Sequence, residues 1–173
     1  MANTRGIFTL RTILDDKIPL NKWVDLNNVW ISPSPFVSPA PNTGYFAGGF
    51  TPGPSTKSTM DKVTYSSDTT AAVPGAALSL GRWALAATGN STSGYFGGGG
   101  PGPYSTMDKV TYASDTTAAV PGAALSAARR YLAATGNSDA GYFGGGNPTS
   151  SLIDKVTYSS DTTAAVPGAA LSV

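Results

Sequence analysis

The amino-acid sequence predicts an all-β protein built from three repeated units of four short strands each. The first observation is the repeat itself: Asp-Lys-Val-Thr-Tyr begins at residues 61, 108 and 154, and Val-Pro-Gly-Ala-Ala-Leu-Ser begins at residues 73, 120 and 166. The second is composition, since the 173 residues include no Glu and no Gln, two strong helix formers. Thr, Ser, Val, Tyr and Gly dominate instead, which suits strands joined by tight turns.

Four strands are expected in each unit. The first is Trp83–Thr88, or Tyr131–Thr135 in the next unit, and a Gly-Asn-Ser turn joins it to a second strand, Gly-Tyr-Phe-Gly-Gly. The third strand, Asp61–Ser67 in the first unit, alternates polar and apolar residues, as a strand with two different faces does. A turn at Asp68-Thr69 leads to the fourth strand, Thr70–Val73, which a Pro-Gly pair ends.

The repeats also set the predicted domain boundaries. Laying residues 36–49 on residues 86–99 completes the first unit, so three units are expected at about 31–79, 80–126 and 127–173. Their lengths differ only within the Gly-, Pro- and Ser-rich stretches 50–59, 100–106 and 147–152. Length variation confined to these stretches marks them as exposed loops. Residues 1–30 differ in kind and are predicted to form a separate leader.

One motif lies at the same place in every unit. It consists of Tyr45, Phe46, Gly48 and Gly49 in the first unit, Tyr95, Phe96, Gly97 and Gly98 in the second, and Tyr142, Phe143, Gly144 and Gly145 in the third. An arginine, Arg82 or Arg129, precedes the strand of small residues, and a Val/Tyr strand ending in an Asp/Thr turn follows the Gly pair. With these features the units resemble the kelch repeat, the four-stranded blade of one β-propeller family.

The kelch resemblance implies β-propeller blades in which the arginine is structural and bonds backbone carbonyls between blades. Most kelch blades carry a Trp before the closing loop, whereas Ala71-Ala72-Val73 stands there in this sequence. The units are therefore expected to be kelch-like and divergent.

The repeats are also similar to those in virion and tail-fibre proteins of tailed phages, particularly marine ones. The segments that carry this resemblance are Gly-Tyr-Phe-Gly-Gly-Gly, Asp-Lys-Val-Thr-Tyr-Ser-Ser-Asp-Thr-Thr and Leu-Ala-Ala-Thr-Gly-Asn. The resemblance implies a structural or adhesive virion protein, made in the host cytoplasm, that belongs to a tail fibre or related appendage. It implies as partners other virion proteins, further copies of this chain, or a glycan on the host surface.

The leader contains candidate assembly residues. Leu10, Ile13 and Leu14 recur at helical spacing until a proline stops the pattern, so one short helix is expected. Trp23 and Trp30 belong to a second apolar stretch. Apolar surface this concentrated is normally covered. Two interpretations stay open: the leader packs on the outside of the first unit, or it is an attachment arm that docks onto another virion protein or a sister chain.

The sequence argues against enzyme chemistry. His and Cys are both absent, so the commonest general base, the usual activator of a Ser nucleophile and thiolate metal ligands are missing. The net charge of +1 does not attract nucleic acid. No apolar run approaches the roughly 20 residues that a membrane span needs. We expect no enzyme activity, no cofactor, no metal and no membrane insertion.

Two repeated aspartates are the remaining candidates for metal ligands. They are Asp61, Asp108 and Asp154 at the start of the third strand, and Asp68, Asp115 and Asp161 at the turn that follows it. Their oxygens would suit Ca²⁺. The two positions lie at opposite ends of one strand, however, roughly 20 Å apart. Capping of turns and strand edges is therefore the predicted role.

Three blades are too few for a closed ring and would leave an open edge at each end. We therefore predict that the chain does not close alone. Two chains would complete a six-bladed ring by a two-fold operation, or the leader and neighbouring proteins would cap the stack. Two other functions stay open: a carbohydrate-binding lectin-like module, and a piece of a larger kelch-type enzyme.

Overall fold

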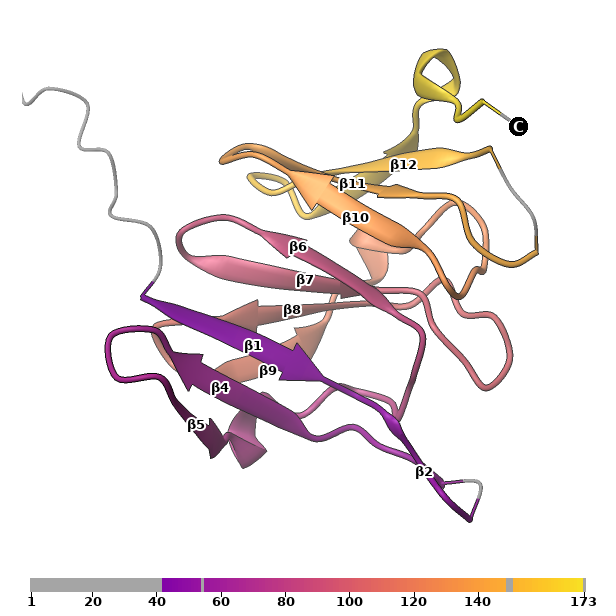
Figure 1. Ribbon diagram of the computed structural model, residues 1–173. Helices are drawn as coiled ribbons and strands as arrows, with labels where there is room; N and C mark the ends of the chain where they lie inside the picture. The colour runs from indigo at the N-terminus through magenta and orange to yellow at the C-terminus, as the bar shows by residue number, and fades with distance from the viewer. Residues whose placement is uncertain (1–41, 54, 149–150, 173) are drawn as a thin grey trace, which may run out of the picture. The chain divides into compact units, whose positions relative to one another are not determined.

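The computed structural model describes residues 42–53, 55–148 and 151–172. These residues form an all-β fold of four small antiparallel sheets (Figure 1). The predicted all-β class is thereby confirmed. The leader, the predicted first strand of the first unit and the boundary near residue 31 lie outside the described residues.

The second and third units are four-stranded meanders with the same layout. The second unit contains β6 (Ala86–Gly89), β7 (Ser93–Gly97), β8 (Met107–Thr111) and β9 (Thr116–Ala119), followed by the 3-10 turn η3 (Pro121–Ala123). The third unit contains β10 (Ala133–Gly136), β11 (Ala140–Gly144), β12 (Ile153–Thr157) and β13 (Thr162–Ala165), followed by η4 (Pro167–Ala169). In each unit, strands that are consecutive in sequence pair side by side.

The described part of the first unit contains three strands of the same meander. They are β1 (Thr43–Ala47), β4 (Met60–Thr64) and β5 (Thr69–Ala72), followed by η2 (Pro74–Ala76). A separate hairpin of β2 (Phe50–Thr51) and β3 (Ser55–Thr56) occupies the first variable loop.

Local sequence signals explain where the strands end. The side-chain oxygen of Asn90 accepts hydrogen bonds from the backbone N–H groups of Thr92 (2.9 Å) and Ser93 (3.0 Å), which closes the turn between β6 and β7. In the turn after β8, Asp115 has a left-handed backbone with φ 51°, which Asp tolerates better than most residues. Proline begins each 3-10 turn, where its missing N–H is not needed.

The prediction of first strands over Trp83–Thr88 and Tyr131–Thr135 is wrong at the start, since β6 and β10 begin later. Ala84 (φ 53°) and Tyr131 (φ 59°) have left-handed backbones, and such a residue turns the chain out of the extended conformation. The predicted third strand also extends too far. It ends at Thr64, and the next residues form the turn.

Each unit has two chemically different faces, because successive side chains of a strand point to opposite sides of the sheet. What we call the lysine face consists of Tyr45, Met60 and Lys62 in the first unit, Tyr95, Met107 and Lys109 in the second, and Tyr142, Ile153 and Lys155 in the third. What we call the phenylalanine face consists of Phe46, Asp61 and Val63, then Phe96, Asp108 and Val110, and then Phe143, Asp154 and Val156.

The hydrophobic core lies between units, where a lysine face meets the phenylalanine face of the next unit. One cluster joins Tyr95, Met107, Ala123 and Leu125 of the second unit to Leu132, Phe143, Val156 and Tyr158 of the third. The other joins Met60, Ala76 and Leu78 of the first unit to Phe96 and Val110 of the second. Because the core forms at these junctions, each unit needs a neighbour to cover its apolar residues.

Candidate functional site

The junction between the first two units is held by a buried arginine. The backbone of Arg82 bonds the loop of the first unit, since its N–H donates to Lys57 (3.0 Å) and its carbonyl accepts from Gly49 (2.8 Å). Arg82 itself belongs to the second unit, and its Nη1 donates to the carbonyls of Gly98 and Thr106 in that unit (both 2.8 Å). Nη2 lies 2.6 Å from Oδ2 of Asp108, and both side chains are fully buried.

The same clamp recurs at the next junction. Arg129 Nη1 donates to the carbonyls of Gly145 and Leu152 (both 2.8 Å), and Nη2 lies 2.5 Å from Asp154. Burial lowers the pKa of Arg82, and the adjacent Asp108 carboxylate opposes that shift. An arginine pairs well with several acceptors at once because its donors form a planar fork. The clamp therefore fixes the distance and orientation of neighbouring units.

A second polar contact joins each pair of units. Lys62 Nζ, from the lysine face of the first unit, lies 3.0 and 2.8 Å from the two carboxylate oxygens of Asp115 in the second. The hydroxyl of Tyr45 donates to the same carboxylate (2.5 Å). The Lys62 nitrogen also lies 5.8 Å from the centre of the Tyr45 ring, within cation–π distance.

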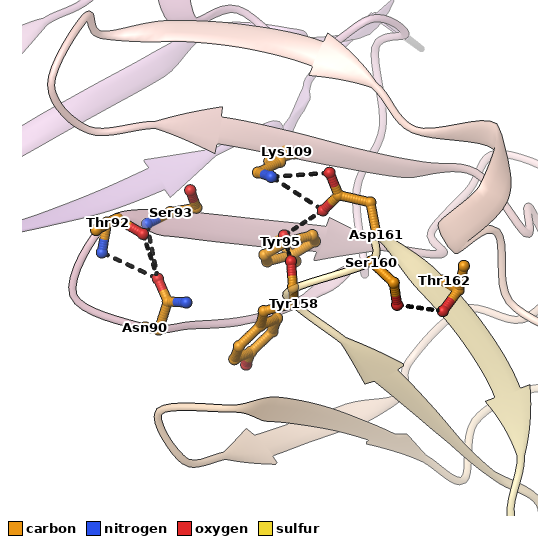
Figure 2. A network of polar contacts seen from close by, with 9 residues as sticks. All are labelled: Asn90, Thr92, Ser93, Tyr95, Lys109, Tyr158, Ser160, Asp161 and Thr162. Atoms are coloured by element: carbon orange, nitrogen blue, oxygen red, sulfur yellow. Dashed lines mark hydrogen bonds and ion pairs between the residues drawn. The ribbon is translucent and has the colours of Figure 1, made fainter.

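Figure 2 shows the corresponding contact between the second and third units. Lys109 Nζ, on β8, lies 2.9 Å from both carboxylate oxygens of Asp161, which belongs to the turn between β12 and β13. The hydroxyl of Tyr95, on β7, donates to the same carboxylate. The two junctions are therefore built from the same residue types at the same repeat positions.

These contacts shift the pKa values of their members in a consistent way. Hydrogen bonds from Lys62 and Tyr45 lower the pKa of Asp115. Partial burial alone would raise the pKa of Asp161, but the hydrogen bonds from Lys109 and Tyr95 lower it. Burial, and then the Asp115 hydrogen bond, raises the pKa of Tyr45. Each junction therefore favours an ionised aspartate beside a neutral tyrosine.

Stacked rings and a threonine complete each junction. The rings of Tyr45 and Tyr112 stack with centres 5.0 Å apart, and those of Tyr95 and Tyr158 stack at 4.8 Å. Burial, with the electrostatic effect of Tyr45, raises the pKa of Tyr112 to about 12. The hydroxyls of two threonines in the fourth strands donate to carbonyls of the preceding 3-10 turns. These bonds are Thr117 to Ala76 (2.5 Å) and Thr163 to Ala123 (2.6 Å).

The predicted Tyr-Phe-Gly-Gly motif contributes to both faces and to the turn that follows. Its tyrosines lie on the lysine faces and its phenylalanines on the phenylalanine faces, as defined above. Gly98 has φ 70°, and a Cβ added there would lie 2.6 Å from the carbonyl oxygen of Arg129. Gly48 and Gly145 also have left-handed backbones. Gly48 and Gly98 thus allow close contact with the backbone of the clamp arginines.

The structure gives the repeated aspartates a different role from the predicted turn capping. Asp108 and Asp154 pair with the clamp arginines, and Asp115 and Asp161 bind lysine and tyrosine across the junctions. Within the described residues, no group of three potential metal-ligating side chains comes together. No helix in that same part of the chain is long and apolar enough to cross a membrane.

The candidate assembly residues of the leader, Leu10, Ile13, Leu14, Trp23 and Trp30, lie outside the described residues. Their predicted role stays a prediction.

The structure also contains an aromatic cluster that the sequence did not lead us to expect. It consists of Phe50, Trp83, Arg130 and Tyr131. The ring of Trp83 lies 5.8 Å from that of Phe50 and 5.4 Å from that of Tyr131, while the Arg130 guanidinium lies 5.7 Å from Trp83. Phe50 and Tyr131 are both exposed. In the sequence, the only indication of this cluster was that the residue types at these positions differ from one unit to the next.

The aromatic cluster adjoins the variable loops. Phe50 lies in the first loop, Trp83 bridges to Gly100, and Arg130 bridges to Asn147. Arg130 also donates to the carbonyl of Pro101 (2.7 Å). Residues from all three units therefore meet at the edge where the loops emerge.

No protein-family model matches the chain, and no curated protein is significantly similar to it.

Proposed function

We propose that the chain is a structural and adhesive, non-enzymatic component of a phage virion, part of a tail fibre or related appendage. In this proposal the stacked units act as a kelch-like β-propeller platform that presents the variable loops to a partner. The observation that carries the adhesive role is the aromatic cluster beside those loops.

The composition of the aromatic cluster suits molecular contact. Trp, Tyr and Arg are the residue types enriched at the energetic centres of protein interfaces. Phe50 and Tyr131 remain exposed although the chain has cores in which such rings could be buried. Exposed apolar groups gathered in one place commonly mark an interaction site.

The junctions supply the rigidity that a platform needs. Neighbouring units pack on both faces of the second unit, and a buried arginine clamp lies at each junction. Loops fixed to such a scaffold keep their relative positions, which reduces the entropy lost on binding.

Immunogold electron microscopy with an antibody against the 173-residue chain tests the virion role. Virions purified from a strain that carries the gene should be labelled on an appendage. Unlabelled virions, with the protein confined to the host lysate, would overturn the proposal.

Binding of the fluorescently labelled chain to whole host cells tests the adhesive role. Replacing Phe50→Ala and Tyr131→Ala together should reduce binding, because it removes both exposed rings of the aromatic cluster. Leu80→Ala, an exposed apolar residue outside the cluster, is the matched control. Equal binding by all variants would refute a role for the cluster.

A second candidate function is glycan binding at a polar cavity between the second and third units. The cavity has a volume of about 420 Å³ and is lined by Asn90, Asp139, Lys155 and Tyr158 among others. Amide, carboxylate and ammonium groups beside an aromatic ring can hydrogen-bond and stack on a sugar. A glycan array probed with the whole chain would decide this, since failure to bind any sugar excludes the lectin-like role.

A further inference from the structure

The two outer faces of the unit stack are the two halves of the junction that occurs twice inside the chain. Within the described residues, no unit packs on the phenylalanine face of the first unit or on the lysine face of the third. We propose that the lysine face of the third unit binds the phenylalanine face of the first unit in a second copy of this chain. This inference is independent of where the protein acts and of what its loops contact.

The lysine–tyrosine–aspartate contact of the internal junctions is present in two separate halves, one at each end of the stack. Asp68 occupies the repeat position of Asp115 and Asp161, but it is exposed and makes no side-chain hydrogen bond or ion pair within the described residues. At the other end, Lys155 Nζ lies 6.0 Å from the centre of the Tyr142 ring. This matches the lysine–tyrosine pairs of the internal junctions, yet no carboxylate of the described chain binds it.

The apolar residues show the same incompleteness. Phe46 is 70% exposed, whereas its counterparts Phe96 and Phe143 are 4% and 0% exposed. Leu171 is 44% exposed, whereas Leu78 and Leu125 are each 4% exposed. The residue types are the same, and the exposed members are those whose face is covered by no other unit among the described residues.

The ring stack and the threonine bond are also divided between the two ends. Tyr65, at the position of Tyr112 and Tyr158, is 57% exposed, and Tyr142 is the unstacked ring of the third unit. Thr70 is the exposed counterpart of the two donating threonines, and Ala169 is the exposed counterpart of the two accepting alanines. For each contact of the internal junctions except one, the third unit therefore carries one of the two partners and the first unit carries the other.

The exception is the arginine clamp, and it sets the strength of the association. Asp61 is exposed where Asp108 and Asp154 are buried, and no described arginine pairs with it. The junction between copies thus lacks the buried ion pair of the internal ones. Its charge contact, between Lys155 and Asp68, is also more accessible to salt. We expect a reversible association that depends on concentration and ionic strength.

The contact joins different surfaces of the two copies, so its result depends on the rotation between units. Such contacts close into a ring when the rotation permits and otherwise continue as an open chain. Two copies supply six units, enough for a ring in which both contacts are identical.

Sedimentation analysis of the full chain, from about 1 to about 100 µM, is the primary test. The chain should pass from a single copy to a dimer or larger species as concentration rises. Asp68→Lys and Lys155→Asp should each weaken association roughly tenfold or more, because each places like charges together. Gly102→Asp, which adds a charge in an exposed loop of the second unit outside both end faces, should leave association unchanged.

Mixing the two charge-reversal variants gives the decisive result. In the mixture, an introduced lysine at position 68 faces an introduced aspartate at position 155, and the unmodified Asp68 faces the unmodified Lys155. Association should return in the mixture although neither variant associates well alone. A chain that stays monomeric throughout the concentration range, or charge reversals that neither weaken association singly nor restore it together, would overturn the proposal.

Discussion

Arg82 and Asp108 neutralise each other's charge inside the second unit, beside the junction with the first, with no exposure to water. Removing two charges from water costs several kcal/mol per ion, so such a pair persists only with additional hydrogen bonds. The carbonyls of Gly98 and Thr106 provide them. Asp61, at the same repeat position, is exposed. One chain thus contains the same aspartate in both environments.

We predict that Asp108→Ala destabilises the protein by about 3–5 kcal/mol, because it leaves the Arg82 guanidinium buried without a counter-charge. Asp61→Ala should change the free energy of unfolding by no more than about 0.5 kcal/mol, as exposed substitutions usually do. Urea denaturation followed by circular dichroism measures both.

The double variant Arg82→Met, Asp108→Leu provides a further control for the clamp. It removes both charges, so most of the lost stability should return. If Asp61→Ala proved as damaging as Asp108→Ala, burial would not be the cause of the effect.

The junction aspartates should make the fold sensitive to acid. The pKa of Asp115 is lowered below its ordinary value of 3.8 by hydrogen bonds from Lys62 and Tyr45. A carboxyl group whose pKa is lower in the folded state stabilises the fold above its ordinary pKa. That stabilisation is lost as the pH falls through the lower folded value. Because both partners are partly exposed, we expect about 1 kcal/mol or less from this pair.

Urea midpoints measured from about pH 7 down to about pH 3 test the acid sensitivity. Asp115→Asn should lower the midpoint at neutral pH and flatten its decline in acid, whereas Asp139→Asn should leave the decline unchanged. Parallel pH profiles for Asp115→Asn and the wild-type chain would contradict this assignment.

Among the elements, the glycine turn after the second strand positions each clamp. At Gly98 the chain has a left-handed backbone and passes close to the carbonyl of Arg129. At Gly102, in the same loop, an added Cβ would meet nothing within 4 Å. The two glycines of one loop therefore differ in both backbone conformation and surroundings.

We predict that Gly98→Ala destabilises the protein by more than about 1–2 kcal/mol, the strain of a left-handed non-glycine residue alone, because a steric clash adds to it. Gly102→Ala should be neutral or slightly stabilising, since it reduces the freedom of the unfolded chain. Thermal denaturation compares the two variants directly. Equal melting temperatures would show that the turn can rearrange.

For the strands, the alternation of residue types predicted the central residues of each strand but not its first residue. The alternation in Asp-Lys-Val-Thr is visible in sequence because opposite faces have different neighbours. The left-handed backbones of Ala84 and Tyr131 cannot be predicted from the sequence, because neither residue type favours that conformation. The predicted strands therefore begin too early at these two places.

In the molecule as a whole, the apolar residues are distributed over junctions between units. Phe143 of the third unit packs in the cluster with Tyr95 and Met107 of the second. Stability in such a stack depends on contacts between nearest neighbours. A substitution at a junction should therefore affect two units together.

We predict that Phe143→Ala lowers the free energy of unfolding by about 3–5 kcal/mol, as expected for a buried aromatic residue reduced to Ala. Phe50→Ala removes an exposed ring that packs at one side on Trp83, so it should cost about 1 kcal/mol or less. Chemical denaturation of both variants provides the comparison. A similar loss of unfolding free energy for the two variants would show that Phe143 is not part of the hydrophobic core.

Some residues of the junctions between units could be predicted from the sequence, and others could not. Arg82 and Arg129 stood out because charge is scarce around them. The partners of Lys62 and Lys109 did not, because Asp115 and Asp161 lie more than 50 positions away and contact a different unit. Repetition fixes what every unit contains, but the pairing of faces between units becomes visible only in three dimensions.

The variable loops and the repeated strands are under different evolutionary constraints. Residues of the strands and clamps are tied to a partner in the next unit, so a change on one face requires a matching change on another. Pro101, Gly102 and Pro103 are exposed and lie between two strands whose ends are joined by the hydrogen bond from Gly98 N–H to the Thr106 carbonyl. Descendants of such a gene can therefore exchange, lengthen or shorten these loops while inheriting the repeats unchanged.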